Sequence, residues 1–216
     1  ACEEGGTTFD SNRELTSFFD VNTYSLNKLV CDPFGGGNPN QNGGLRGKLY
    51  YSDANENSYN SVFDYIDQGT LSDKDIFFTD LNVPTRRFEL GFPTQVGDLI
   101  QNDDGDDLIE NFALDFETVM QLTDEQEAGY YEFALLSDDG AVIEIKENGS
   151  YITLVDNDGL HPTRMGCTNR TVYMDQDTQF LAKIRYYQGP RHHISVIPIM
   201  RKLAGENDAV QDSQCG

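Results

Sequence analysis

The strongest constraint on the fold is an alternation of apolar and other residues that recurs from about residue 111 onward. Neighbouring side chains of a β-strand point to opposite faces, so a period of two predicts strands with one buried face. Turn residues such as Gly140, Asn148-Gly149 and Asp158-Gly159 separate the runs and favour antiparallel neighbours. The sequence therefore predicts an all-β protein, an antiparallel β-sandwich with long loops. The alternating positions are Phe112, Leu114, Phe116; Tyr131, Phe133, Leu135; Phe180, Ala182, Ile184, Tyr186; and Ile194, Val196, Met200.

The first part of the chain has a different composition. Residues 1–43 are polar and end in a Gly/Asn-rich run, which is typical of loops and linkers. We expect them to form an irregular strap packed on a sandwich over residues 44–203, followed by a tail over residues 204–216. A chain of 216 residues fits one sandwich domain. The stretch from Tyr51 to Asn111 is expected to be irregular, and its acidic run 102–107 a solvated loop.

The charge of the chain limits its partners. Lys and Arg total 15 against 37 Asp and Glu, a formal net charge of −22. This excess excludes a nucleic-acid phosphate binder and disfavours an anionic membrane surface. It favours metal ions or a basic protein partner. The sequence contains no run of 18 apolar residues, so no membrane insertion is expected.

The four cysteines indicate the compartment. Cys2, Cys31, Cys167 and Cys215 are far apart and form no C-x-x-C pair. An even number without metal-binding spacing predicts two disulfides and an oxidising, extracytoplasmic location. The three possible connectivities stay open. Alternatively, Cys2 carries a lipid anchor and leaves three thiols.

Catalytic motifs are missing from the sequence, so we expect no enzyme. His161, His192 and His193 lie in no metalloprotease spacing, and there is no G-x-S-x-G or phosphate-binding Gly-rich loop. Asp138 and Asp139 could be imagined as an acid/base pair. They are adjacent, however, and in an extended strand their side chains would point to opposite faces and could not act on one bond.

Two acidic turns offer the oxygen ligands that Ca²⁺ prefers. They are Asp138-Asp139-Gly140 and Asp156-Asn157-Asp158-Gly159. The EF-hand pattern fails when it is aligned on Gly159 or on Gly105. The same residue types also form ordinary turns, so composition alone leaves a calcium site open.

Three ordered motifs between Gly129 and Gln188 narrow this choice. They are Gly129-Tyr130-Tyr131-Glu132-Phe133 leading to Ser137-Asp138-Asp139-Gly140, then Val155-Asp156-Asn157-Asp158-Gly159-Leu160-His161, then the strand that ends in Tyr186-Tyr187-Gln188. Together with a first strand at residues 44–50, this order resembles the PA-fourteen family, the β-sandwich domains named after the anthrax protective antigen. The resemblance covers roughly residues 44–201. The Tyr51–Asn111 stretch departs from the family core and looks like an insertion.

The resemblance implies a calcium site. In the family a cis peptide often joins the two adjacent aspartates, which would bring Asp138 and Asp139 to one side of the chain to hold Ca²⁺. Gln188 is then expected to ligate through its side chain or carbonyl, at the start of a loop over residues 189–192. The alternative is a plain hairpin turn at residues 137–140 with a trans peptide.

Other residues receive lesser roles under the same resemblance. Arg191 and His192 are expected to contact a sugar at the rim of the site. Asp156, Asn157 and Asp158 form a possible secondary loop, or else simply hydrogen-bond their own backbone. His161 is expected to be a packed, hydrogen-bonded residue.

The function that follows is an extracellular, calcium-dependent carbohydrate-binding domain of an adhesin or lectin, secreted or at the cell surface, with glycans as partners. Two alternatives remain. One is a protein–protein scaffold module of a surface assembly, and the other is an accessory binding module of a carbohydrate-active enzyme.

Overall fold

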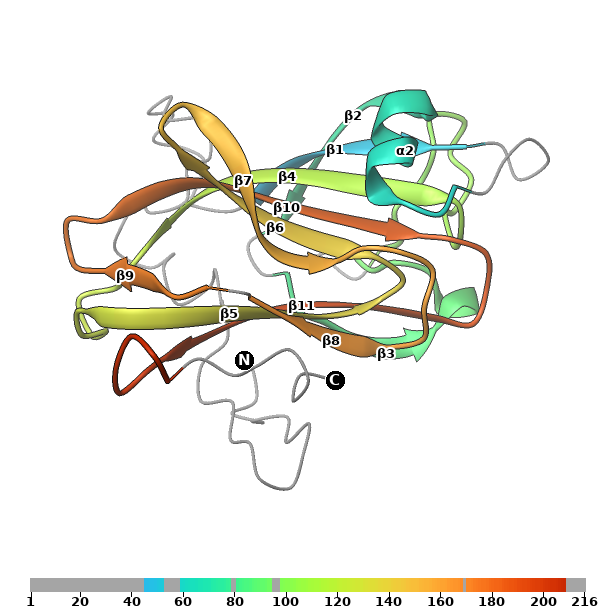
Figure 1. Ribbon diagram of the computed structural model, residues 1–216. Coiled ribbons are helices and arrows are strands. Elements are labelled where there is room, and N and C mark those ends of the chain that lie inside the picture. Colours follow the sequence, from blue (N-terminus) through green and yellow to red (C-terminus); the bar gives the residue numbers. More distant parts are fainter. Residues whose placement is uncertain (1–44, 53–58, 79–80, 95–97, 169, 209–216) are drawn as a thin grey trace.

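The computed structural model describes residues 45–52, 59–78, 81–94, 98–168 and 170–208. Two antiparallel sheets pack face to face in these residues, as Figure 1 shows. This arrangement confirms the predicted all-β sandwich. The predicted strap over residues 1–43, together with Cys2, Cys31 and Cys215, lies outside the described residues, so the domain division and the disulfides stay predictions.

Each sheet has its own strand order. The six-stranded sheet runs β2 (Thr70–Phe78), β1 (Leu45–Tyr51), β4 (Phe112–Gln121), β10 (Gln179–Gln188), β6 (Ala141–Glu147) and β7 (Ser150–Asn157). The five-stranded sheet runs β3 (Val83–Arg87), β11 (His193–Lys202), β5 (Gly129–Asp138) and β8 (Arg164–Cys167), and β9 (Val172–Met174) also pairs with β5.

The hydrophobic core lies between the sheets and follows the predicted alternation. Leu114 and Phe116 of β4, Phe133 and Leu135 of β5 and Ile184 of β10 are at most 2 % exposed and belong to one cluster. Burial of such apolar area is the main favourable term in folding. Period two thus located β4, β5, β10 and β11 correctly.

The expectation of an irregular stretch between Tyr51 and Asn111 is wrong for residues 62–90. This stretch contains the helix α2 (Val62–Gln68), the strands β2 and β3, and a 3₁₀ helix η1 (Phe88–Leu90). β2 extends one sheet at β1, and β3 extends the other at β11. Both are edge strands, where charged side chains are common. The exposed run 73–75 of β2 therefore hides its alternation.

The helix α2 lies on the outer face of the six-stranded sheet, over β4 and β10 (Figure 1). Ser61 is its N-cap and accepts a hydrogen bond from the Phe63 amide. Val62 and Tyr65 are buried, and the Tyr65 ring stacks on Tyr187 with centroids 5.3 Å apart. The helix α2, in the Tyr51–Asn111 stretch, is thereby packed against the end of β10.

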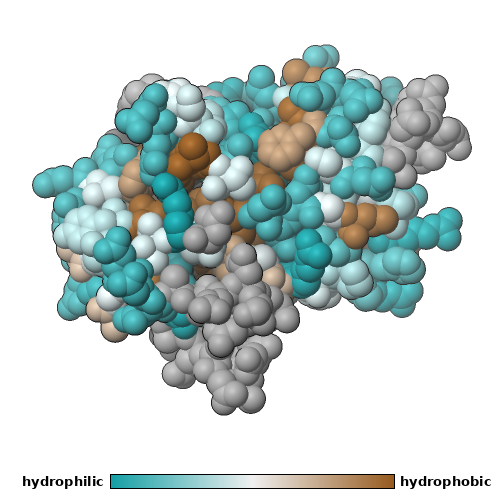
Figure 2. All heavy atoms as spheres, viewed as in Figure 1, coloured by the Kyte–Doolittle hydropathy of each residue, from teal (hydrophilic) through white to brown (hydrophobic). Residues whose placement is uncertain are grey.

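The surface agrees with the polar composition. Figure 2 shows hydrophilic groups over most of the visible face, with hydrophobic groups in small areas between them. The acidic run 102–107 is mostly exposed, as predicted. In the described part of the chain, no helix has both the length and the hydrophobicity of a membrane span.

Candidate functional site

The candidate site is built where the chain passes from one sheet to the other. Asp138 ends β5 in the five-stranded sheet, and Ala141 begins β6 in the six-stranded sheet. The peptide bond between Asp138 and Asp139 is cis, as the resemblance implies. The alternative of a plain hairpin with a trans peptide is therefore wrong, since β5 and β6 are not paired with each other.

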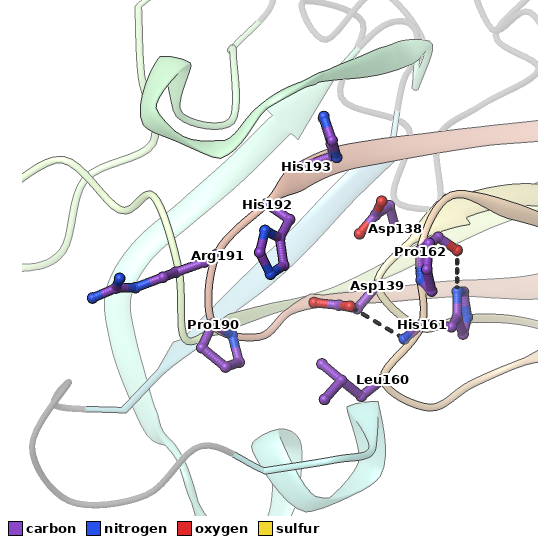
Figure 3. A pocket seen from close by; sticks show the side chains of 9 residues that line it. All are labelled: Asp138, Asp139, Leu160, His161, Pro162, Pro190, Arg191, His192 and His193. Carbon is purple, nitrogen blue, oxygen red and sulfur yellow. Dashed lines mark hydrogen bonds between the residues drawn. The ribbon is translucent and has the colours of Figure 1, made fainter.

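Both aspartates line one surface pocket of about 470 Å³ (Figure 3). Three segments form its walls, namely residues 138–139, 160–162 and 190–193. Arg191 and His192, predicted as rim residues, belong to this wall and are exposed. In Figure 3 the Arg191 side chain points away from the two carboxylates. The lining residues are Asp138, Asp139, Leu160, His161, Pro162, Pro190, Arg191, His192 and His193.

The carboxylate of Asp138 is held by Thr163, just before β8, and its backbone is held from β10. Its Oδ2 accepts a hydrogen bond from the Thr163 hydroxyl at 2.8 Å. Its carbonyl oxygen lies 2.7 Å from the Tyr186 hydroxyl. Burial raises the pKa of Tyr186 well above its usual value, so the phenol keeps its proton and acts as a donor.

The carboxylate of Asp139 is held by two backbone amides. The His161 amide donates to Oδ1 at 3.3 Å, and the Gly189 amide donates to Oδ2 at 2.9 Å. These two contacts fix the carboxylate between the segments 160–162 and 190–193. Asp139 lies between β5 and β6, and its carboxylate is therefore positioned by residues of the neighbouring loops.

The two carboxylates are buried together, and in the described part of the chain no Lys or Arg pairs with them. Asp138 is 2 % exposed and Asp139 is 4 % exposed. Burial, together with the neighbouring Asp138 charge, raises the pKa of Asp139 to about 6, and burial also raises the pKa of Asp138. Within the described ranges, neither forms an ion pair with Lys or Arg.

Gln188, predicted as a ligand, lies beside the pocket and does not line it. The side chain is fully buried, and its Oε1 lies 2.6 Å from the Tyr186 hydroxyl. Its Nε2 lies 3.4 Å from the carbonyl oxygens of Gly189 and Arg191. Gln188 therefore supports the loop 189–192 from behind.

The residues of the predicted secondary loop do not line the pocket. Asp156 is exposed and accepts from the Asp158 amide at 3.1 Å, the local bond that the alternative expected. Asp158 accepts from the Ser61 hydroxyl at 2.6 Å and from the Val62 amide at 3.0 Å. It therefore holds the start of α2.

Asn157, in the second acidic turn, is buried. Its Nδ2 donates to the Ser137 hydroxyl at 2.8 Å, and its Oδ1 accepts from the Arg164 guanidinium at 2.9 Å. None of residues 156–158 lines the pocket with Asp138 and Asp139. This turn is thus a structural neighbour of the site.

Several residues of the site were not foreseen. Thr163, Pro162 and His193 carry no motif of their own, although residues 162–163 closely follow the second acidic turn, and Leu160 of the second motif and Pro190 of the expected loop 189–192 had been given no role. That proximity was the available signal. His161 is packed and hydrogen-bonded as expected, since it is 7 % exposed with each ring nitrogen 2.9 Å from a carbonyl oxygen, of Pro162 and of Asn157.

The comparisons with known proteins concern the fold. No family model matches the chain, and no curated protein matches it. Solved structures with a similar arrangement include a PA14 sugar-binding domain from an RTX adhesin, with 20 % identity, 75 % of this chain and 91 % of that chain covered, and a TM-score of 0.48.

Two further similar structures differ widely in length. One is the Epithelial Adhesin 6 A domain from Candida glabrata in complex with Galβ1-3GlcNAc. It is 13 % identical, the match covers 80 % of this chain and 85 % of that chain, and the TM-score is 0.49. The other is an anti-sigma factor domain-containing protein, with 17 % identity and a TM-score of 0.48; 80 % of this chain matches 48 % of that protein, about half its length. At these scores and identities the likenesses carry no argument about a ligand. The observed sheets and pocket define a β-sandwich with a paired-carboxylate surface site.

Proposed function

We propose that this chain is an extracellular, calcium-dependent carbohydrate-binding domain of the adhesin or lectin type. The observation that carries the proposal is the buried pair Asp138 and Asp139, which opens into one surface pocket without a Lys or Arg partner in the described residues. Buried carboxylates are stable only when they are protonated or neutralised by a cation. The motif resemblance supports calcium and a sugar as the groups that complete the site.

The donor atoms of the site fit a hard cation. Carboxylate oxygens are preferred ligands of Ca²⁺, which takes about six to eight oxygens. Among the described residues, no three His, Cys, Asp or Glu side chains are placed to hold a metal ion. Asp138 and Asp139 would hold the calcium, and the remaining oxygens would come from the loop 189–192, the glycan and water. Gln188 is proposed to contribute by supporting that loop.

Bound Ca²⁺ would offer its open coordination positions to two adjacent sugar hydroxyls. The chain itself supplies the walls, which include Leu160, 56 % exposed, and Pro190 (Figure 3). These apolar groups would contact the C–H face of a sugar, and Arg191 and His192 would donate hydrogen bonds. Tyr186 and Tyr187 are fully buried and do not line the pocket, so they offer no ring for stacking.

The proposed role is binding rather than catalysis. The lining residues include no Ser, Cys or Lys that could serve as a nucleophile beside a base. Both carboxylates are also fixed by hydrogen bonds from the surrounding segments. This arrangement suits an ion ligand, whose position must be held.

The test is calcium titration of the full chain by calorimetry, together with a glycan array with and without EDTA. The variant Asp138→Asn/Asp139→Asn should lose calcium and glycan binding by at least about a hundredfold, because each buried charge–ligand contact contributes several kcal/mol. The matched control is Asp156→Asn/Asp158→Asn, which changes the net charge equally and should bind normally. EDTA-insensitive glycan binding, or full binding by the first variant, would contradict the proposal.

The net charge of −22 favours a second candidate, a scaffold module that docks on a basic protein. A blank glycan array in calcium, with salt-sensitive capture by a basic partner of the same surface assembly, would support it.

A further inference from the structure

Residues 190–193 form one wall of the pocket (Figure 3), and the backbone of this wall is unusual. Arg191 and His192 both have a positive φ, of +67° and +75°. Glycine adopts this left-handed region readily, whereas residues that carry a Cβ adopt it rarely. Two consecutive non-glycine residues keep such a conformation only where surrounding contacts hold them in it. The shape of this wall therefore depends on contacts from other parts of the chain.

The contacts that hold this wall include two from the Tyr51–Asn111 stretch. The Arg191 amide donates a hydrogen bond to Oε2 of Glu110 at 3.1 Å. The Phe88 amide, at the start of η1, donates to the carbonyl oxygen of His192 at 3.1 Å. The second bond joins two backbone groups, whereas the first needs an acceptor side chain at position 110. The identity of residue 110 therefore decides whether the Arg191 amide finds this acceptor.

Glu110 belongs to a backbone segment that is itself fixed. Asn111, the next residue, also has a positive φ, of +60°. Its Oδ1 accepts a hydrogen bond from the Tyr65 hydroxyl of α2 at 3.2 Å, and its carbonyl oxygen accepts from the Ser52 amide at 2.9 Å. Tyr65 also stacks on Tyr187 at the end of β10. The Glu110 carboxylate thus reaches the pocket wall from a segment that is anchored to α2 and to the end of β1.

The loop that Glu110 contacts also binds one of the two carboxylates. It begins at Gly189, whose amide donates to Oδ2 of Asp139 at 2.9 Å. Arg191 follows two residues later, so loss of its anchor would let the amide donor of Asp139 and the carbonyl oxygens of the loop move. We propose that Glu110 is a positioning residue, which holds the loop 189–192 in the conformation that binds calcium and the glycan. This inference rests on the proposed function.

The contact itself is tested without any ligand. Amide hydrogen exchange of the full chain is followed by NMR in EDTA for the wild type, Glu110→Ala and Glu110→Gln. Exchange at the Arg191 amide should become about tenfold faster in Glu110→Ala, because the amide loses its acceptor, and should stay within about threefold in Glu110→Gln, which keeps an acceptor oxygen. Exchange at the amides of β10 reports any general loss of stability. Equal exchange at Arg191 in all three proteins would overturn the proposal.

The positioning role is tested by calcium titration with calorimetry. Glu110→Ala should weaken calcium binding by about tenfold, and Glu110→Gln by less than about threefold. Both variants remove one negative charge, so rescue by glutamine separates the position of the loop from the attraction between charges. Asp104→Ala is the matched control, because it removes an exposed carboxylate from the acidic run 102–107 and should bind calcium within about twofold of the wild type.

The possible results separate this inference from the proposed function. Equal weakening in Glu110→Ala and Glu110→Gln would show that charge alone is responsible and would overturn the positioning role. If the wild type binds calcium and Glu110→Ala binds it equally well, the positioning role is wrong and the proposed function stands. If the wild type binds no calcium, the proposed function fails and the positioning role fails with it, and the exchange data then report only a structural contact.

Discussion

The two acidic turns at one end of the sandwich have similar sequences and different uses. Asp138 and Asp139 line a pocket, whereas the Asp158 carboxylate is occupied by the Ser61 hydroxyl and the Val62 amide at the start of α2. A helix start supplies free amide donors that a carboxylate satisfies well. The two turns contain the same types of acidic residue. Whether their carboxylates can bind a cation therefore depends on which hydrogen-bond donors the fold places beside them.

The largest effect is expected from filling the space at Gly140 in the first turn. An alanine Cβ there would lie 2.4 Å from the Tyr187 ring and 2.7 Å from the Gly159 amide nitrogen. Gly140→Ala should lower the free energy of unfolding by about 3 kcal/mol, the upper range for overpacking a rigid site. Urea unfolding would measure this loss. A normal midpoint would show that the two turns are not in tight contact.

The next effect concerns the contact between the second turn and α2. Asp158→Ala removes the acceptor of the Ser61 and Val62 bonds and should cost roughly 2 kcal/mol, as hydrogen bonds to charged groups do. Asp158→Asn keeps an acceptor oxygen and should cost less. Thermal unfolding compares the two variants. Equal stability of Asp158→Ala and the wild type would contradict the assigned role.

The pH response should separate the two turns. The pKa of Asp139 is raised from 3.8, its value in the unfolded chain, to about 6 in the folded chain. Without calcium, the protonated Asp139 carboxyl therefore adds to the free energy of unfolding below pH 3.8, and this contribution is lost as the pH rises through about 6. A cation binds the deprotonated form, and calcium affinity should therefore fall by about tenfold between about pH 7 and pH 5.

Two variants check the assignment of this response. In EDTA, Asp139→Asn should lose less stability than the wild type when the pH is raised from about 4 to 7. Asp158→Asn should follow the wild type. If the pH response disappeared in Asp158→Asn and persisted in Asp139→Asn, the response would belong to Asp158, and its assignment to Asp139 would be wrong.

The smallest effect is expected at the glycine of the second turn. Gly159 has φ +106°, and no atom lies near the position of an added Cβ. Gly159→Ala should therefore cost about 1 kcal/mol from backbone conformation alone, less than Gly140→Ala, where the obstacle is contact. Parallel denaturant titrations of both variants would test this order.

The sequence predicted the central strands because their alternation is complete. It missed β2, whose exposed residues 73–75 are charged, and α2, which has two turns and only two buried residues, Val62 and Tyr65. Short edge elements carry too few buried positions to show a period.

The candidate site was predictable only in part. The motif located Asp138 and Asp139, but the position of Gln188 depends on a bond to Tyr186 that strand spacing does not reveal. Thr163 contacts Asp138 across 25 positions of the chain, and no local pattern reports such a contact. Local motifs thus identify the acidic pair, and tertiary packing decides its surroundings.

The passage of the chain between the two sheets at Asp138 and Asp139 has a mechanical consequence. Asp138 belongs to the ladder with β11, whereas Asp139 is fixed by Gly189 at the end of β10 in the opposite layer. A guest that held both carboxylates and also touched the loop after β10 would therefore fasten one layer to the other. Shear that slides the layers apart would then have to break the guest's contacts as well as the Gly189–Asp139 hydrogen bond.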